Sequence, residues 1–165
     1  MNIVVTSENK VLWQGKVYPC ASGKGGFTTD KKEGDGATPV GCFPIRRVFY
    51  RPDRFRAVKT DLPVQVIHEN DGWCDDPEDE RYNRLIRLPA SISHEKMWRE
   101  DGLYDVVVEI GYNDDPPVKG RGSAIFMHVA RPGYAPTEGC VAMTLKDLLE
   151  VIKTAKPETM IEIKP

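Results

Sequence analysis

A histidine and a cysteine lie on either side of a short loop near the C-terminal end of the chain. The apolar run 124–128 ends on His128, a loop containing Pro and Gly follows, and the chain returns with Gly139 and Cys140. A thiol with an ordinary pKa of about 8.5 is only slightly ionised at neutral pH, and an adjacent imidazolium increases its thiolate fraction. The segment therefore predicts a thiolate–imidazole pair and cysteine-based acyl transfer. The alternative is that Cys140 is a small buried apolar residue and His128 a structural one.

Each residue of this segment has a predicted role. Cys140 attacks a carbonyl to form a thioester, and His128 acts as base and acid in turn. The N–H groups of Gly139 and Cys140 are expected to bind the oxyanion, because glycine allows a close approach. Three roles are open for Glu138: it accepts a hydrogen bond from the ammonium group of the acceptor, it holds the loop in place, or it is an ordinary surface charge. A carboxylate beside sulfur raises a thiol pKa, so its charge is expected to point away or to pair, with Arg131 the nearest candidate.

Two separated segments resemble the L,D-transpeptidase catalytic domain (YkuD-like) family. Residues 137–140 read Thr-Glu-Gly-Cys and, with the upstream histidine, resemble the signature Ser/Thr-His-Gly-Cys. Residues 37–45 read Ala-Thr-Pro-Val-Gly-Cys-Phe-Pro-Ile and match the early segment Thr-Pro-x-Gly-x-Phe-x-Ile. The resemblance spans almost the whole chain. It implies a mainly β fold, a β-sandwich of mixed sheets with one or two short helices, and peptidoglycan stem peptides as substrates.

The chain also departs from the family signature. Glu138 stands where the signature has histidine, Ala142 stands where an arginine is usual, and the loop between His128 and Thr137 is short. The segments 72–77 and 111–116 resemble a proteobacterial Thr-Glu-Gly-Cys subgroup. That resemblance implies 1-3 cross-links, from L-alanine of one stem to meso-diaminopimelate of another, in place of 3-3 cross-links.

The resemblance and the loop composition together give a set of substrate-binding candidates. Tyr134 and Pro136 are expected to shape the loop, and each remaining candidate has an ordinary turn or core role as its alternative. The candidates are Thr137, Glu138, Arg131, Tyr134, Tyr112, Asn113, Trp73, Asp75, Ser123 and Arg47. His68 and His94, with no nucleophile nearby in sequence, are predicted to be structural.

Three functions compete at this point. The first is L,D-transpeptidation, in which a meso-diaminopimelate amine accepts the acyl group. The second is an L,D-carboxypeptidase or endopeptidase, in which water is the acceptor, and water exclusion separates the two. The third is a non-catalytic peptidoglycan-binding β domain. The resemblance further implies that carbapenem-type β-lactams acylate Cys140.

Composition limits the class of protein. The chain has 165 residues, of which 40% are hydrophobic, and a formal net charge of −2. This length is expected to form a single domain over 1–165, and the charge argues against nucleic-acid or membrane-surface binding. Five arginines around aromatic residues form either a solvated face or a dock for an anionic polymer: Arg46, Arg47, Arg51, Arg54 and Arg56.

The cysteine pattern predicts neither a metal site nor a cofactor. The four cysteines, Cys20, Cys42, Cys74 and Cys140, form no Cys-x-x-Cys pair. A nucleophile must stay unpaired, so free thiols are expected, with at most one disulfide. The N-terminal residues lack a basic region followed by a long apolar run, so no Sec-type signal peptide and no membrane span are expected. The implied substrate places the protein in the periplasm or cell wall, with the export route open.

Strand-like runs dominate the chain. Short β-rich segments separated by Gly, Pro, Asp and Asn are expected at 2–6, 11–18, 42–50, 64–68, 103–110, 124–129 and 160–163. A short helix is expected at 93–100, with Met97 and Trp98 facing inward. A longer helix is expected at 145–155, capped by Thr144 and ended by Pro157. The Gly-rich, charged segment 24–36 is expected to be a surface loop at the rim of the site.

Overall fold

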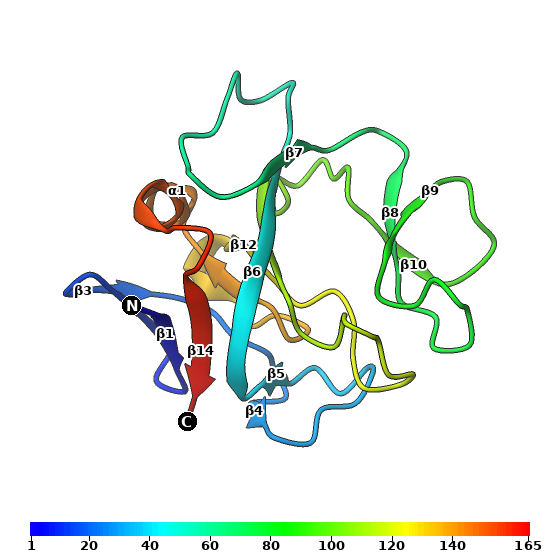
Figure 1. Cartoon of the computed structure of the whole chain (residues 1–165), viewed down its shortest axis with the longest axis horizontal. Coiled ribbons are helices and arrows are strands. Elements are labelled where there is room, and N and C mark those ends of the chain that lie inside the picture. Colours follow the sequence, from blue (N-terminus) through cyan, green and yellow to red (C-terminus); the bar gives the residue numbers. More distant parts are fainter.

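The computed structural model describes residues 1–165 and is built mainly from strands, with one α-helix (Figure 1). The predicted mainly β fold with mixed sheets is confirmed. In chain order the elements are β1 (Ile3–Thr6), β2 (Lys10–Trp13), β3 (Lys16–Pro19), β4 (Phe27–Thr28), β5 (Thr38–Pro39), β6 (Gly41–Tyr50), β7 (Val64–Val66), β8 (Asp71–Cys74), β9 (Leu85–Arg87), β10 (His94–Lys96), β11 (Val106–Ile110), β12 (Phe126–Val129), the 3-10 turn η1 (Pro132–Tyr134), β13 (Val141–Met143), α1 (Leu145–Thr154) and β14 (Met160–Lys164).

A large mixed sheet runs through the molecule in the order β13-β12-β11-β6-β14-β1-β2-β3, and β7 also pairs with β6. The long strand β6 joins its two halves: residues 41–44 pair with β14, and residues 45–50 pair with β11. A register shift between Glu109 and Ile110 accompanies this change of partner. Bulges of this kind bend a strand and increase its twist, so the sheet can enclose a core (Figure 1).

Helix α1 fills the concave side of this sheet. Its N-cap Thr144 accepts a hydrogen bond from the Asp147 N–H at 3.2 Å, as the sequence predicted. Leu148, Val151 and Ile152 are buried against apolar side chains of the large sheet, whereas Leu145 and Leu149 are only partly buried. The helix therefore fixes the chain directly after β13.

A second, smaller core lies between the large sheet and the antiparallel sheet β10-β8-β9, the lobe at the right of Figure 1. Trp73 of β8 packs edge-to-face on Phe126 of β12, with ring centroids 5.1 Å apart. Successive side chains of a strand point to opposite faces of the sheet. Met127 of β12 therefore packs in the core around α1, and its neighbour Phe126 packs in this second core. Cys140 is also a member of the second core.

The structure corrects several predicted elements. The predicted helix at 93–100 is wrong, because this segment contains β10, which pairs with β8; Met97 is nevertheless buried and Trp98 half-buried. The predicted strand at 11–18 is a hairpin of β2 and β3, turned at Gln14 and Gly15, which both have positive φ. The strands expected from residues 103 and 124 begin later, at Val106 and Phe126. No helix is both long and apolar enough to span a membrane.

The arginine-rich segment is mostly ion-paired. Four of the five arginines bind carboxylates: Arg46 with Asp114, Arg47 with Glu109, Arg51 with Asp53, and Arg54 with Asp105. Arg51 is buried and stacks on Trp98, with its guanidinium carbon 3.6 Å from the ring centroid, so the prediction of a solvated face is wrong for this residue.

Candidate active site

Cys140 is held by backbone groups of the segment that leads into β12. It directly precedes β13, which runs parallel to β12 with His128 opposite Ala142. The Cys140 thiol donates a hydrogen bond to the carbonyl of Ala124 at 3.2 Å and accepts one from the Phe126 N–H at 3.4 Å. These contacts fix the direction of the thiol in the absence of substrate.

His128 lies on the same face of β12 as Phe126 and is 5% exposed. Its Nδ1 lies 2.9 Å from the carbonyl oxygen of Val129, which can only accept a hydrogen bond. The proton is therefore on Nδ1, and Nε2 carries the free lone pair. The ring of Tyr104 packs edge-on against the imidazole, with centroids 5.4 Å apart. The tautomer with its proton on Nδ1 is the one that a general base acting through Nε2 requires.

Cys140 and His128 line one cavity of about 160 Å³. Thr137, Glu138 and Arg131 of the predicted set line it too. The complete lining is Glu95, Arg99, Leu103, Tyr104, His128, Arg131, Ala135, Pro136, Thr137, Glu138, Cys140 and Ala142. The structure thus brings together the predicted nucleophile, the predicted base and part of the predicted loop.

Both reactive groups are neutral in the resting protein. Burial raises the pKa of the Cys140 thiol to about 12, and the nearby Glu95 carboxylate acts in the same direction. Burial lowers the pKa of His128 to about 4. Both shifts favour a neutral pair in the resting state over the thiolate–imidazole pair predicted from the sequence. Desolvation penalises the Cys140 thiolate and the His128 imidazolium, so it favours a neutral thiol and a neutral imidazole.

The turn before Cys140 is held by Thr137. Its hydroxyl donates to the carbonyl of Cys140 at 2.6 Å and accepts from the Gly139 N–H at 3.1 Å. Gly139 has φ +136°, and a Cβ at this position would lie 2.8 Å from the carbonyl oxygen of Ala37. Glycine is required here on both grounds. Because the Gly139 N–H is already bonded to Thr137, only the Cys140 N–H, which has no partner, remains of the two predicted oxyanion donors.

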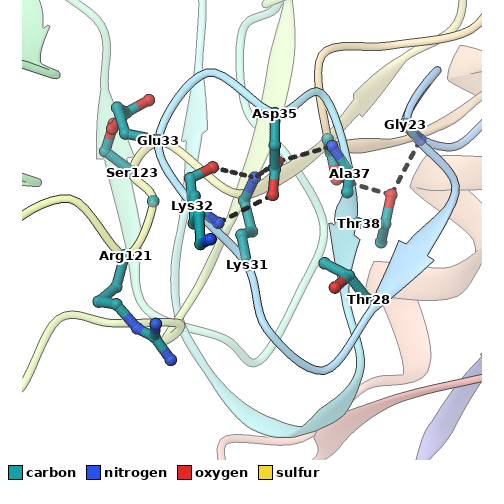
Figure 2. A network of polar contacts seen from close by, with 12 residues as sticks. Gly23, Thr28, Lys31, Lys32, Glu33, Asp35, Ala37, Thr38, Arg121 and Ser123 are labelled. Carbon is teal, nitrogen blue, oxygen red and sulfur yellow. Dashed lines mark hydrogen bonds and ion pairs between the residues drawn. The ribbon is translucent and has the colours of Figure 1, made fainter.

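The Thr-Pro segment supports the same turn from behind. The hydroxyl of Thr38 donates to the carbonyl of Gly139 at 2.9 Å and accepts from the Gly23 N–H at 2.8 Å (Figure 2). In the adjoining loop, buried Lys31 forms an ion pair with Asp35 at 2.7 Å. Asp35 also accepts from the N–H of Ala37, the residue before Thr38. The two motifs that are distant in sequence are therefore parts of one hydrogen-bonded unit.

Comparison with protein-family models gives one match. The model of the L,D-transpeptidase catalytic domain, YkuD, covers residues 2–163. The chain belongs to this family. Searches of curated proteins and of solved structures gave no significant match. This family has L,D-transpeptidase activity and acts on peptidoglycan.

In this L,D-transpeptidase family member, several predicted substrate contacts lie behind the cavity and not in it. Asn83, which the sequence analysis did not select, connects them. Its Oδ1 accepts from Trp73 Nε1 at 2.9 Å and from the Ala124 N–H at 3.0 Å, and its Nδ2 donates to the carbonyls of Tyr112 and Asn113. Since the Ala124 carbonyl accepts from the thiol, Asn83 positions the nucleophile indirectly.

The remaining predicted residues are also placed outside the cavity. Buried Ser123 donates to Glu33 at 2.6 Å, and the amide of Asn113 is bonded to the carbonyls of Val118 and Gly122. Tyr134 lines a different hollow beside Pro136, and Arg47 is paired with Glu109. We therefore assign structural roles to Ser123, Asn113, Trp73 and Tyr112, and no role in the cavity to Tyr134 or Arg47. Asp75, adjacent to β8, likewise does not line the cavity.

Glu138 is paired with a different residue from the one expected. Its side chain is 74% exposed and pairs with Lys24 at 2.8 Å, whereas Arg131 lies 4.0 Å from Asp101. The expected Glu138–Arg131 pair is therefore wrong, although the expectation that the charge is paired is met. Lys24 belongs to the segment 24–36, so this end of the segment lies at the rim of the site.

The cavity contains five residues that the sequence analysis missed: Glu95, Arg99, Leu103, Tyr104 and Ala135. Glu95 and Arg99 fall in the segment that was assigned to a helix. The alternation of His94, Glu95, Lys96 and Met97 was the available signal, since in a strand it sends Glu95 and Met97 to one face.

Proposed function

We propose that the protein is a peptidoglycan L,D-transpeptidase in which Cys140 is the nucleophile and His128 the general base and acid. The observation that carries the proposal is the shared cavity, in which the thiol is oriented by Ala124 and Phe126 and the imidazole by Val129. The family match over residues 2–163 supports the same activity. Acting on peptidoglycan, the protein works in the periplasm or cell wall.

The reaction begins from a neutral thiol. As Cys140 Sγ attacks the donor carbonyl, His128 Nε2 takes the thiol proton, so that neither group bears a charge before substrate arrives. The tetrahedral oxyanion is stabilised by the Cys140 N–H. His128 then protonates the departing amine, and a thioester remains on Cys140. The Nδ1 hydrogen bond to Val129 keeps the imidazole oriented through both proton transfers.

The acyl group ends on the amine of a second stem. We propose that the amine is that of meso-diaminopimelate and that the donor is cut after L-alanine, which gives a 1-3 cross-link. Two features support this assignment. The first is Ala142, which lies opposite His128 in the ladder and lines the cavity, so that a small side chain stands where the family signature has an arginine.

The second feature is a wider hollow of about 930 Å³ that shares Arg99 with the catalytic cavity. His94 and Lys96 of β10 also line it, as do the acidic residues Glu69, Glu100 and Asp101. When the donor stem is cut after its first residue, the rest of the stem is the leaving group. The protein must therefore recognise the donor through the charged groups of that leaving group. A polar hollow of this size that adjoins the catalytic cavity at Arg99 offers a place for that remainder.

Tandem mass spectrometry of products from defined muropeptides tests this proposal. A dimer joined from L-alanine to meso-diaminopimelate, formed by the wild type and absent with Cys140→Ala, is the expected result. A dimer joined between two diaminopimelates would return the protein to the 3-3 class. Hydrolysed monomer without dimer would identify a carboxypeptidase or endopeptidase, and binding without any product would identify a non-catalytic domain.

A further inference from the structure

The catalytic cavity contains a carboxylate other than that of Glu138. Glu95 lies in the middle of β10, opposite Trp73 of β8. Because side chains alternate along a strand, His94 and Lys96 face the wider hollow and Glu95 faces the cavity that holds Cys140 and His128. β10 therefore separates the two hollows and directs a single acidic group at the reacting atoms.

This carboxylate has no cationic partner. Its one hydrogen bond is accepted from the Tyr104 hydroxyl at 3.0 Å. Lys96, the next residue, lines the other hollow, and Arg99, which lines the cavity with Glu95, binds Asp101 with two hydrogen bonds and lies over the Tyr104 ring at 5.1 Å. Burial raises the pKa of Glu95, the Asp75 and Glu33 carboxylates act in the same direction, and the Tyr104 hydrogen bond and the Arg99 charge oppose the rise without cancelling it. An unpaired acid in a desolvated cavity is costly unless a cation joins it.

Glu138 provides the contrast. It also lines the cavity, but its side chain is largely exposed and already bound to Lys24. Of the two cavity carboxylates, only Glu95 is not already bound to a cation. The cation that the reaction itself brings to this place is the acceptor, a primary amine that is an ammonium ion in neutral solution.

We propose that Glu95 binds the ammonium group of the acceptor and removes one of its protons before the amine attacks the thioester. This inference rests on the proposed function and adds the residue that selects the acceptor. It assigns to Glu95 the role that the sequence had left open for Glu138.

The proton balance of the second half-reaction follows from this role. One ammonium proton moves to Glu95, and the neutral amine nitrogen forms a bond with the thioester carbon. His128 Nε2 takes a second proton from that nitrogen. The carbon–sulfur bond then breaks, the sulfur of Cys140 receives the proton from His128, and the amide is released. Glu95 returns its proton to solvent, so that thioester and ammonium give amide, thiol and one free proton.

A comparison of Glu95→Gln with Glu138→Gln tests the inference. Acyl-enzyme formation is followed by intact mass with a donor muropeptide whose diaminopimelate amine is acetylated. Transfer is then measured to an ammonium acceptor, meso-diaminopimelate-containing muropeptide, and to hydroxylamine, which is uncharged at mildly alkaline pH. Glu95→Gln is expected to acylate within about threefold of wild type and to lose about 10²-fold in transfer to the ammonium acceptor. Transfer to hydroxylamine is expected to change less than about threefold. In Glu138→Gln the ratio of the two transfer rates, to the ammonium acceptor and to hydroxylamine, is expected to stay within about threefold of the wild-type ratio.

Equal losses with both acceptors, or no loss with the ammonium, would overturn the role of Glu95. Absence of any acyl-enzyme on wild-type Cys140 would instead reject the proposed function. If Glu95→Gln does not fold, Glu95→Asp, which keeps the charge, must retain a preference for the ammonium acceptor over hydroxylamine. A wild-type protein without that preference contradicts the inference without any variant.

Discussion

Alkylation of Cys140 by iodoacetamide is predicted to behave as the reaction of a buried neutral thiol. The reagent reacts with the thiolate, whose fraction at a given pH depends on the thiol pKa. Burial moves this pKa from 9.0 to about 12. A difference of three units lowers the thiolate fraction about 10³-fold near neutral pH, so Cys140 should be labelled at least that much more slowly than an unperturbed thiol.

Two changes test this prediction of the alkylation rate: a change of pH and the substitution His128→Gln. Because the pKa of His128 is about 4, the imidazole carries no positive charge near neutral pH, and its replacement removes no cation from the sulfur. The labelling rate should rise about tenfold per pH unit from about pH 6 to pH 9 in both proteins, without a plateau.

Peptide mass mapping measures the rate separately for each cysteine. All four cysteines are free, and exposed Cys42 reports that the reagent is active at every pH. Buried Cys20, whose pKa is also raised to about 12, shows what burial alone does. A plateau in Cys140 labelling between about pH 6 and pH 8 that disappears in His128→Gln would refute the neutral pair and restore the ion pair predicted from sequence.

Three further predictions concern stability and inhibition. The pKa of His128 is about 4 in the folded protein and ordinarily 6.5, so the unfolded chain binds more protons than the folded protein between these two pH values. The free energy of unfolding should therefore fall as the pH drops from about 6.5 to 4, by about 3 kcal/mol more in the wild type than in His128→Gln. Urea unfolding measures this difference. Asn83→Ala leaves four hydrogen-bonded groups without their partner and should cost about 3 kcal/mol or more in thermal or urea unfolding, and a loss below 1 kcal/mol would contradict its supporting role. A carbapenem should add its mass to the protein at Cys140 and not to Cys140→Ala, and a wild-type adduct mapped to another residue would refute the assignment of the nucleophile.

The sequence predicted those parts of the fold that depend on local signals. Thr144 as a cap, the apolar spacing of Leu148 and Ile152 and the breaker Pro157 all act within a few residues, and α1 was predicted almost to its ends. The segment 93–100 was mistaken for a helix because the partner that makes it a strand, β8, lies some twenty residues away in sequence. Strand pairing depends on that distant neighbour and has only the alternation of side chains as a local signal.

The residues of the site divide in the same way, into those that local sequence signals identify and those whose role depends on distant neighbours. Cys140 and His128 were found because their residue types and the flanking motif indicate chemistry by themselves. Asn83 looks like an ordinary turn residue, and its role arises only where Trp73 and Ala124 meet it. The charge states were also beyond the sequence, since the burial that neutralises Cys140 and His128 comes from the packing of the small sheet on β12.

The central claim is that Cys140 carries the acyl group, and the mass of the acyl-enzyme tests it most directly. Wild-type protein mixed with a disaccharide-tetrapeptide whose diaminopimelate amine is acetylated, so that no acceptor is present, then quenched in acid and digested, should carry on Cys140 an adduct consisting of the disaccharide and L-alanine, with the rest of the stem released. Cys140→Ala should carry none. An adduct that retains the first three stem residues would contradict the 1-3 assignment, and turnover without any adduct on Cys140, or turnover that persists in Cys140→Ala, would contradict the account as a whole.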